Sequence, residues 1–320
     1  MVDRTGFENR RSLRATGGSN PPLSASLLLQ NGGSASKVRY AKVGETLSFS
    51  LAQPPDGEAD KPMITAGIDA GSRALKIVLW DAARQRPAAQ GVRDQGPDHD
   101  AQARALLEEL LAEAHLTRPD LARIVATGYG RQIVSAADTT VTEITCHALG
   151  VRRHVPDAAT IVEIGGQDAK LLRLNRDGTV RDFAMNDRCA AGTGRFLEML
   201  AARLRVPLEA LGDLARRAEA PAPVTSVCVV FAETEIIGLV ASGMRPEAIV
   251  AGVEAAVASR VAAMLGREAL PPVLFTGGVA RVSGMADALA SALGVPVTVS
   301  PEPQFTGALG AALLAWRQAS

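Results

Sequence analysis

The sequence predicts an α/β protein made of two similar halves, and three observations lead to that prediction. An apolar strand, a glycine-containing turn and a second strand occur in "MITAGIDAGSRALKIVLWD" from Met63 and again in "ATIVEIGGQDAKLLRLNRDG" from Ala159. A helical pattern and a further strand separate the two copies. A third glycine turn, in "PPVLFTGGVARVSGMADALASAL", lies between a buried strand and a helix. A unit that recurs in this way indicates an internal repeat.

Residues 1–62 differ in composition from the rest of the chain. They are rich in Ser, Gly, Pro, Arg and Asn and lack a sustained hydrophobic period. We interpret them as a disordered or mis-annotated N-terminal extension, because "MITAGIDAG" is typical of a protein start. The expected domains are then a first half at 63–158 and a second half at 159–300. A C-terminal helix at 301–320 is expected to pack back on the first half.

The elements between the repeat copies follow from periodicity. "HDAQARALLEELLAEAHL" has apolar residues at helical spacing, "ARIVATGYG" is typical of a strand, and a second helix is expected before "HVPDAAT".

In the second half, Cys189 and Cys228 each come directly before a predicted helix. A thiolate is favoured at a helix N-terminus by the positive end of the helix dipole.

Composition narrows the class of protein. Lys plus Arg and Asp plus Glu both number 34 in 320 residues, so no net charge attracts nucleic acid or an anionic membrane. No apolar run reaches the length of a membrane span. Three cysteines are too few for a disulfide framework and indicate a reducing, cytoplasmic environment.

The repeated turns indicate a phosphate site. Tight glycine turns leave backbone N–H groups free for an anion, and a carboxylate in the turn can hold Mg²⁺ through water. Each turn alone could be an ordinary hairpin. Lys76 and Lys170 could contact phosphate or could be solvated strand lysines. No GxxxxGK[ST] or GxGxxG sequence occurs, which argues against the P-loop and Rossmann folds.

The order of "GIDAGSRALK", "IVEIGGQDAK" and "LFTGGVA" resembles the superfamily of acetate kinase, sugar kinases, heat-shock chaperone ATPases and actin. Within it, "ATGYGR", "MNDRCAAGTGRFLEML", "CVVFAETEII" and "QFTGALGAALLA" resemble the activators of 2-hydroxyacyl-CoA dehydratases and the ATP-hydrolysing subunits of benzoyl-CoA reductase. The resemblance implies a two-domain, actin-like ATPase with ribonuclease H-like halves and the nucleotide in the cleft between them.

The resemblance also assigns a role to each residue of the nucleotide site. Asp69, Asp168 and Gln167 would be catalytic, and the two aspartates would hold Mg²⁺ through water. ATP would be bound by the following residues: Gly71, Ser72, Lys76, Gly165, Gly166, Gly277, Gly278 and Val279. Arg73 departs from the family, which commonly has a small hydroxyl residue there.

The cysteines receive their role from the same resemblance. It implies one 4Fe-4S cluster per dimer, with Cys189 and Cys228 from each chain of a homodimer or of a heterodimer with a related subunit. ATP hydrolysis would drive low-potential electron transfer to an iron–sulfur 2-hydroxyacyl-CoA dehydratase or benzoyl-CoA reductase component. Reduced ferredoxin or flavodoxin would supply the electron. Cys146 is expected to be a buried packing residue, and His147 a packed or capping histidine rather than a ligand.

Two other functions remain open from the residues. A small-molecule kinase of the amino-sugar type would use the same fold without a cluster and would need a carboxylate base. Glu233 or Glu235 could serve as that base, although acidic residues in the first turns of a helix ordinarily compensate its dipole. The second alternative is a nucleotide-dependent switch that has lost its cluster. The motifs do not distinguish dehydratase activators from reductase subunits.

Overall fold

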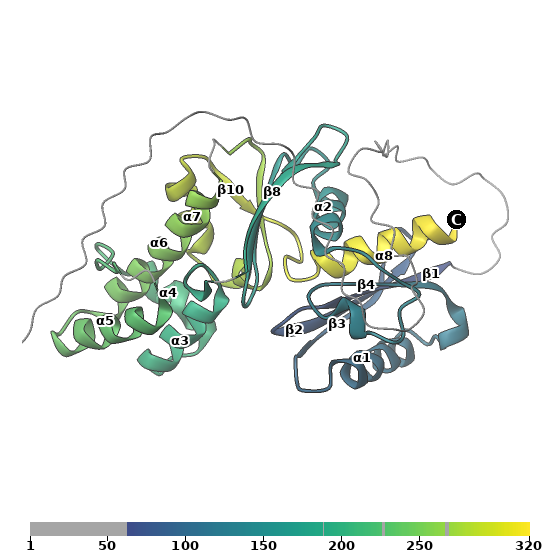
Figure 1. Ribbon diagram of the computed structural model, residues 1–320, viewed down its shortest axis with the longest axis horizontal. Helices are drawn as coiled ribbons and strands as arrows, with labels where there is room; N and C mark the ends of the chain where they lie inside the picture. The colour runs from purple at the N-terminus through teal and green to yellow at the C-terminus, as the bar shows by residue number, and fades with distance from the viewer. Residues whose placement is uncertain (1–62, 188, 226–227, 266–268) are drawn as a thin grey trace, which may run out of the picture. The chain divides into compact units, whose positions relative to one another are not determined.

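The computed structural model describes residues 63–187, 189–225, 228–265 and 269–320, and it contains two five-stranded sheets (Figure 1). The strand orders are β3-β2-β1-β4-β5 and β10-β9-β6-β7-β8. In each sheet an antiparallel meander supplies three strands and the later strands add in parallel on the other side of the first. The common topology confirms the duplication predicted from the repeated turns. The predicted extension, residues 1–62, lies outside the described residues.

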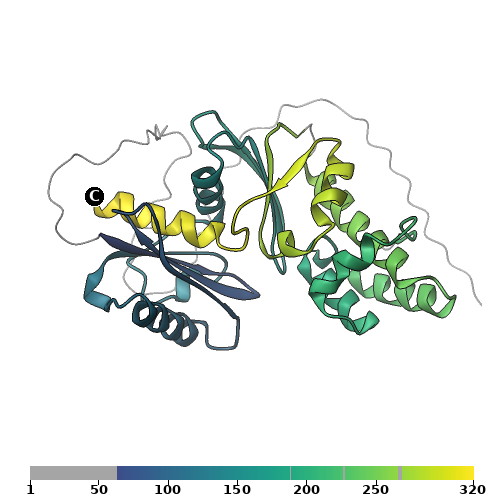
Figure 2. The ribbon, with the colours of Figure 1, turned by 180° about the vertical axis from the view of Figure 1, so that it is seen from behind.

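The first sheet is covered on both faces by helices. Along β2, Leu75, Ile77 and Leu79 belong to the core under α1, whereas Val78 and Trp80 pack against α8. This alternation follows from the two-residue period of a strand. Figures 1 and 2 show α1 and α8 on opposite faces of the sheet. The bounds are β1 (Ile64–Ala70), β2 (Ala74–Asp81), β3 (Arg86–Asp94), β4 (Leu121–Thr127), β5 (Thr139–Thr140), α1 (His99–Glu113) and α8 (Thr306–Ala319), with short 3₁₀ turns η1 (Arg118–Asp120) and η2 (Arg131–Ile133).

Side chains along the central strand of the second sheet also point alternately to its two faces. Val162 and Ile164 of its central strand face the core formed with α3, α6 and α7, whereas Ile161 faces α2. All five residues of "TIVEI" are buried, and three of them, Ile161, Val162 and Ile164, are apolar. The strands are β6 (Thr160–Ile164), β7 (Ala169–Leu174), β8 (Val180–Asn186), β9 (Val273–Thr276) and β10 (Val297–Val299). The helices are α3 (Gly194–Leu204), α4 (Leu211–Ala215), α5 (Val229–Ala241), α6 (Pro246–Met264) and α7 (Met285–Leu293), with 3₁₀ turns η3 (Ala190–Gly192), η4 (Leu208–Ala210) and η5 (Gly278–Arg281).

Helices α2 (Glu143–His154) and α8 cross at very close range. A Cβ on Gly150 would lie 1.9 Å from the Thr306 carbonyl oxygen, and one on Gly310 would lie 1.8 Å from that of Cys146. Any side chain at either glycine would therefore force the helices apart. Since α2 packs on the second sheet and α8 on the first, this crossing connects the two cores.

In the described part of the chain, no helix is both long and apolar enough to cross a bilayer.

Candidate functional site

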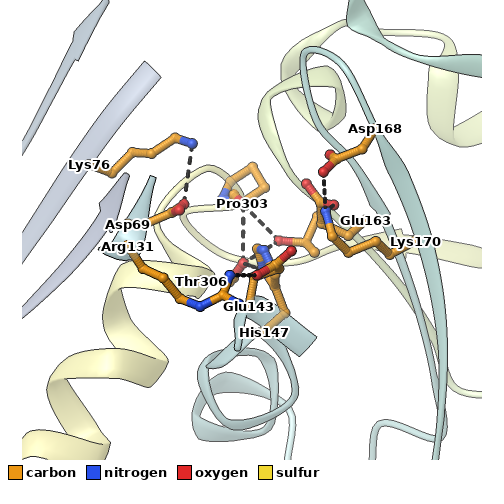
Figure 3. Close-up of polar contacts among 11 residues, drawn as sticks. Asp69, Lys76, Arg131, Glu143, His147, Glu163, Asp168, Lys170, Pro303 and Thr306 are labelled. Carbon is orange, nitrogen blue, oxygen red and sulfur yellow. Dashed lines mark hydrogen bonds and ion pairs between the residues drawn. The ribbon is translucent and has the colours of Figure 1, made fainter. Parts of the chain in front are cut away.

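Asp69 lies at the end of β1 in a crowded backbone environment. It is 5% exposed, and its Oδ2 accepts a hydrogen bond of 3.2 Å from Lys76 Nζ on the neighbouring strand (Figure 3). A Cβ on Gly128 would lie 2.5 Å from Asp69 Oδ1, and one on Gly307 would lie 3.1 Å from Oδ2. These two glycines therefore leave room for the carboxylate. Gly71 and Ser72 follow in the turn and are half-buried.

The second turn holds a buried ion-pair cluster. Lys170 Nζ lies 2.9 Å from Glu163 Oε2 and 2.8 Å from Asp168 Oδ2 (Figure 3). Burial alone would lower the pKa of Lys170, but the two carboxylates outweigh it and the pKa is raised, so the ammonium stays charged. The Lys170 side chain is only 4% exposed, which excludes a solvated strand lysine. Its direct role is to hold Asp168 and Glu163 in place. Gln167 is exposed beside them.

Glu163 is a site residue that our sequence reasoning missed. It pairs across the hairpin with Lys170, as Asp69 pairs with Lys76 in the first half. Both carboxylates precede their lysine by seven residues. This shared spacing was the signal that could have revealed Glu163. By position in the repeat, the counterpart of Asp69 is therefore Glu163, and Asp168 is an additional carboxylate in the second turn.

The predicted adenosine turn lies directly beside the second phosphate turn. Gly277 has φ +90°, and a Cβ there would lie 2.4 Å from the Ile164 carbonyl oxygen and 2.7 Å from Glu163 Oε1. Only glycine fits this position. A Cβ on Gly278, by contrast, would meet no atom within 4 Å. The backbone at Gly278 is therefore open to a ligand, and the following residue, Val279, is 5% exposed.

The N-terminus of α8 joins these turns through a buried hydrogen-bond chain. Thr306 Oγ1 lies 3.0 Å from His147 Nδ1 and 2.7 Å from Thr276 Oγ1 at the end of β9 (Figure 3). Burial lowers the pKa of His147, which favours the neutral ring. His147 is thus a packed residue, as expected. Cys146 beside it is fully buried, and burial raises the pKa of its thiol to about 12.

Arg73 of the first half contacts the second phosphate turn, whereas Arg131 contacts the loop after β4 and α2. Arg73 Nε donates to Glu198 Oε1 on α3 at 2.8 Å, and a Cβ on Gly166 would lie 2.5 Å from the Arg73 Cβ. Arg73, the residue that departs from the family pattern, therefore contacts both the second phosphate turn and α3. Arg131 donates from Nη1 to the Gly128 carbonyl at 3.0 Å and to Glu143 Oε2 at 3.3 Å.

The segment carrying Cys189 is hydrogen-bonded to the second phosphate turn. The Gly194 and Arg195 amides, in the first turn of α3, donate to the carbonyls of Gly165 and Gly166 at 2.9 Å each. Asn186 fixes the Cys189 backbone in both directions, accepting from its N–H at 3.0 Å and donating to its carbonyl at 2.8 Å. Cys189 precedes the 3₁₀ turn η3 rather than α3 itself.

Cys228 begins α5, as predicted, and is exposed. The helix after it is apolar except for Glu233, Thr234 and Glu235, yet of its residues only Ala232 and Ile236 are buried. Val230 is 69% exposed and Phe231 71%. Further along the same helix Ile237 and Val240 are each 49% exposed. This apolar face begins at the cysteine.

Comparison with known proteins gives the lineage. The sequence profile of the BadF/BadG/BcrA/BcrD ATPase family matches residues 66–315. The chain belongs to this family. The activator of lactoyl-CoA dehydratase from Anaerotignum propionicum is 44% identical over 258 residues, which are 80% of this chain and 99% of the relative. One of the subunits of benzoyl-CoA reductase from Thauera aromatica is 31% identical over 262 residues, 78% of this chain and 92% of the relative.

A solved structure of this family shows the same fold. The activator of the 2-hydroxyisocaproyl-CoA dehydratase from Clostridium difficile, with bound ADPNP, aligns with a TM-score of 0.76 and 40% identity, covering 80% of this chain and 96% of that one. The likeness confirms the two-half, actin-like α/β fold predicted from the motifs. Together with the family match it identifies the chain as an ATPase that binds ATP.

Proposed function

We propose that this ATPase uses ATP hydrolysis to drive one-electron transfer to an enzyme that acts on a CoA thioester. The observation that carries the proposal is the pair of backbone hydrogen bonds from the first turn of α3 to Gly165 and Gly166. A change in the phosphate turn on hydrolysis moves the carbonyls that hold α3, and Cys189 lies just before that helix. The nucleotide and the thiolate are thereby connected through one continuous segment.

The nucleotide site fits Mg²⁺ and ATP. Asp69 and Asp168 offer the carboxylate oxygens that Mg²⁺ accepts through water, and Lys170 fixes the orientation of Asp168. Gln167 would position the attacking water. Phosphate would be bound by the turn backbones and by Lys76, and adenosine by the open backbone at Gly278 with Gly277 and Val279. The residues proposed for phosphate are Gly71, Ser72, Lys76, Gly165 and Gly166.

The cysteines fit a 4Fe-4S cluster shared between two chains. Such a cluster needs four thiolates, and Cys189 and Cys228 supply two from each subunit. When bound, it would provide the one-electron donor. The exposed apolar face of α5 starts at Cys228 and supports a dimer, because burying Val230, Phe231 and Ile237 removes apolar area from water. We propose a homodimer, with a heterodimer of related subunits as the variant arrangement.

For the electron acceptor we propose an iron–sulfur 2-hydroxyacyl-CoA dehydratase rather than a benzoyl-CoA reductase component. The 44% identical relative is named as a dehydratase activator, whereas the reductase protein is 31% identical. We further propose reduced ferredoxin or flavodoxin as the electron source and the cytoplasm as the location.

The kinase alternative loses support because both candidates for its catalytic base are engaged in other contacts. Glu233 forms an ion pair with Arg203, and Glu235 accepts hydrogen bonds from the Thr225 amide and hydroxyl at 2.9 and 2.8 Å. Both carboxylates therefore connect α5 to neighbouring segments, where a kinase would need one directed at a substrate hydroxyl.

The test is iron stoichiometry after anaerobic purification. We expect about two irons per chain, because four irons would be shared by two chains. Cys189→Ser and Cys228→Ser should each lose the iron and the dithionite-bleached absorbance, while Cys146→Ser, the buried control, retains both. Four irons per chain, or a Cys189→Ser protein with a full cluster, would refute the shared arrangement.

A further inference from the structure

A cavity of about 490 Å³ lies between the β2–β3 turn, the end of α2 and the start of α8, apart from the turns assigned to the nucleotide. Trp80, Phe305 and Leu309 are the buried apolar part of its lining, and Pro87 and Ala88 are an exposed apolar part. None of the predicted ATP-binding residues lines it. A cavity of this size with apolar walls and a few polar groups is typical of a small-molecule site.

Arg153 lines this cavity with a guanidinium group that is held on two sides. Its Cζ lies 5.3 Å from the centroid of the Trp80 ring, and its Nη2 donates a hydrogen bond of 2.9 Å to the Gln85 carbonyl oxygen. Among the described residues Nη1 has no hydrogen-bond partner, and in contrast to Nε it is accessible. No described carboxylate forms an ion pair with Arg153. The guanidinium is therefore preorganised for a planar anion.

The charged groups of the lining favour an anion. Arg86, at the start of β3, also has no ion pair with a described residue. The one carboxylate of the lining, Glu302, accepts a hydrogen bond of 3.3 Å from Gln90. Burial and Arg153 lower the pKa of His154 more than Glu302 raises it, so its ring is neutral at pH 7. The lining thus carries two guanidinium groups against one carboxylate.

The backbone around the cavity adopts an uncommon conformation at two points. Gln85 has φ +53° and Glu302 has φ +44°, in the left-handed region that residues other than glycine seldom adopt. They are two of the four such residues in the described part of the chain, and both line this cavity. Strain of this kind is concentrated at ligand sites. The Gln85 carbonyl also accepts from Arg153, so the strained turn positions that guanidinium.

We propose that this cavity binds a small carboxylic acid in its ionised form, with the carboxylate at Arg153 and Arg86. The accessible Nη1 of Arg153 supplies a charge-assisted hydrogen bond, and the apolar chain of the acid covers Phe305, Leu309 and Pro87. Arg153 is on α2, which packs on the second sheet, whereas Arg86 is on β3 of the first, so the ligand contacts both halves. This site is independent of the proposed electron transfer.

The test is a ligand-observed NMR titration of the full-length protein with sodium hexanoate at neutral pH and constant ionic strength. We expect saturable binding that weakens about tenfold in Arg153→Gln and about threefold in Arg86→Gln, because each change removes a positive charge. Glu302→Gln removes the one negative charge and keeps an oxygen acceptor for Gln90. It should bind hexanoate about two- to threefold more tightly. Misfolding does not produce a gain in affinity, so this variant decides the question even where Arg153→Gln fails to fold.

Three controls make the result specific. Arg152→Gln changes the neighbouring arginine, which donates to the carbonyls of Asn175 and Arg176 outside the cavity, and should bind as the wild type does. Hexanol and hexylammonium, which have the same chain without a carboxylate, should bind at least about tenfold more weakly. ATP with Mg²⁺ should not displace hexanoate. The proposal is overturned by any of these results: no saturable binding, equal binding of hexylammonium or hexanol, unchanged binding in a folded Arg153→Gln protein, no gain in Glu302→Gln, or full displacement by ATP.

Discussion

At the scale of single residues, the proposed nucleotide site contains carboxylates paired with lysines from the adjacent strand. Lys170 serves two carboxylates and is almost fully buried, whereas Lys76 serves Asp69 alone and its side chain is 17% exposed. A buried cation with two partners is costly to move, because either carboxylate would be left uncompensated. Lys76 is therefore the cation that is free to turn toward a phosphate, and Lys170 is a positioning residue.

The first prediction concerns Asp69 and Asp168. Asp69→Asn or Asp168→Asn should reduce Mg²⁺-dependent ATP hydrolysis by about 100-fold, which corresponds to ~2.7 kcal/mol, because each removes a charged oxygen proposed to orient the metal. Steady-state phosphate release measures the loss, and the iron content should not change. Asp177→Asn, in the exposed turn after β7, is the control. Wild-type turnover in either site variant would remove the carboxylates from the mechanism.

At the scale of elements, α3 receives contacts from both phosphate turns. Its first turn donates to Gly165 and Gly166, and Glu198 one turn later pairs with Arg73 from the first half. The ion pair is partly exposed, so its effect on the free energy of unfolding should be small, about 0–1 kcal/mol. Its larger effect should be on how long the two turns stay closed around the nucleotide.

The second prediction follows from this ion pair. Arg73→Gln and Glu198→Gln should each speed the dissociation of ADP about three- to tenfold, and the double variant should be no faster than either single one, because both remove the same interaction. Stopped-flow release of a fluorescent ADP analogue measures the rate. Arg195→Gln removes the other cation near Glu198, at 3.0 Å, and is the control. Additive effects would show that the two residues act separately.

At the scale of the whole molecule, the described residues contain both sheets and the cores that cover them. The buried clusters use residues from Ile64 onward, and the family profile begins at residue 66. Both sheets, all the predicted site residues and the α2–α8 crossing lie within 63–320. The domain boundaries at 158 and 300 remain predictions, and α2, assigned to the first half, packs on the second sheet.

The third prediction tests the extension directly. Deleting residues 1–62 should change the melting temperature by less than about 2 °C and the ATPase rate by less than about twofold, because a segment of their polar, aperiodic composition is expected to bury little apolar surface. Differential scanning calorimetry and phosphate release measure the two effects. A markedly lower melting temperature would mean that the extension docks on the fold.

The local sequence pattern was sufficient to predict many of the strands, turns and helix starts of this protein. The mainly apolar segments "TIVEI" and "ALKIVLWD" predict strands, and the repeated turns predict two halves of one topology. The helix beginning at Cys228 and the glycine at Gly277 were also predictable, because caps and left-handed turns depend on a few neighbouring residues. Such features need no knowledge of distant contacts.

Only the tertiary structure decided which distant residues meet. The contacts of Arg73 with Glu198, of Thr306 with His147 and of Glu254 with Gly284 join segments far apart in the chain, and no local pattern encodes such distances. The role of Lys170 was equally undetermined, since one strand pattern serves a solvated and a buried lysine until the packing above it is known. The sequence by itself determined the elements and the turn chemistry; long-range packing decided which charges are buried, which are paired, and which are left to a ligand.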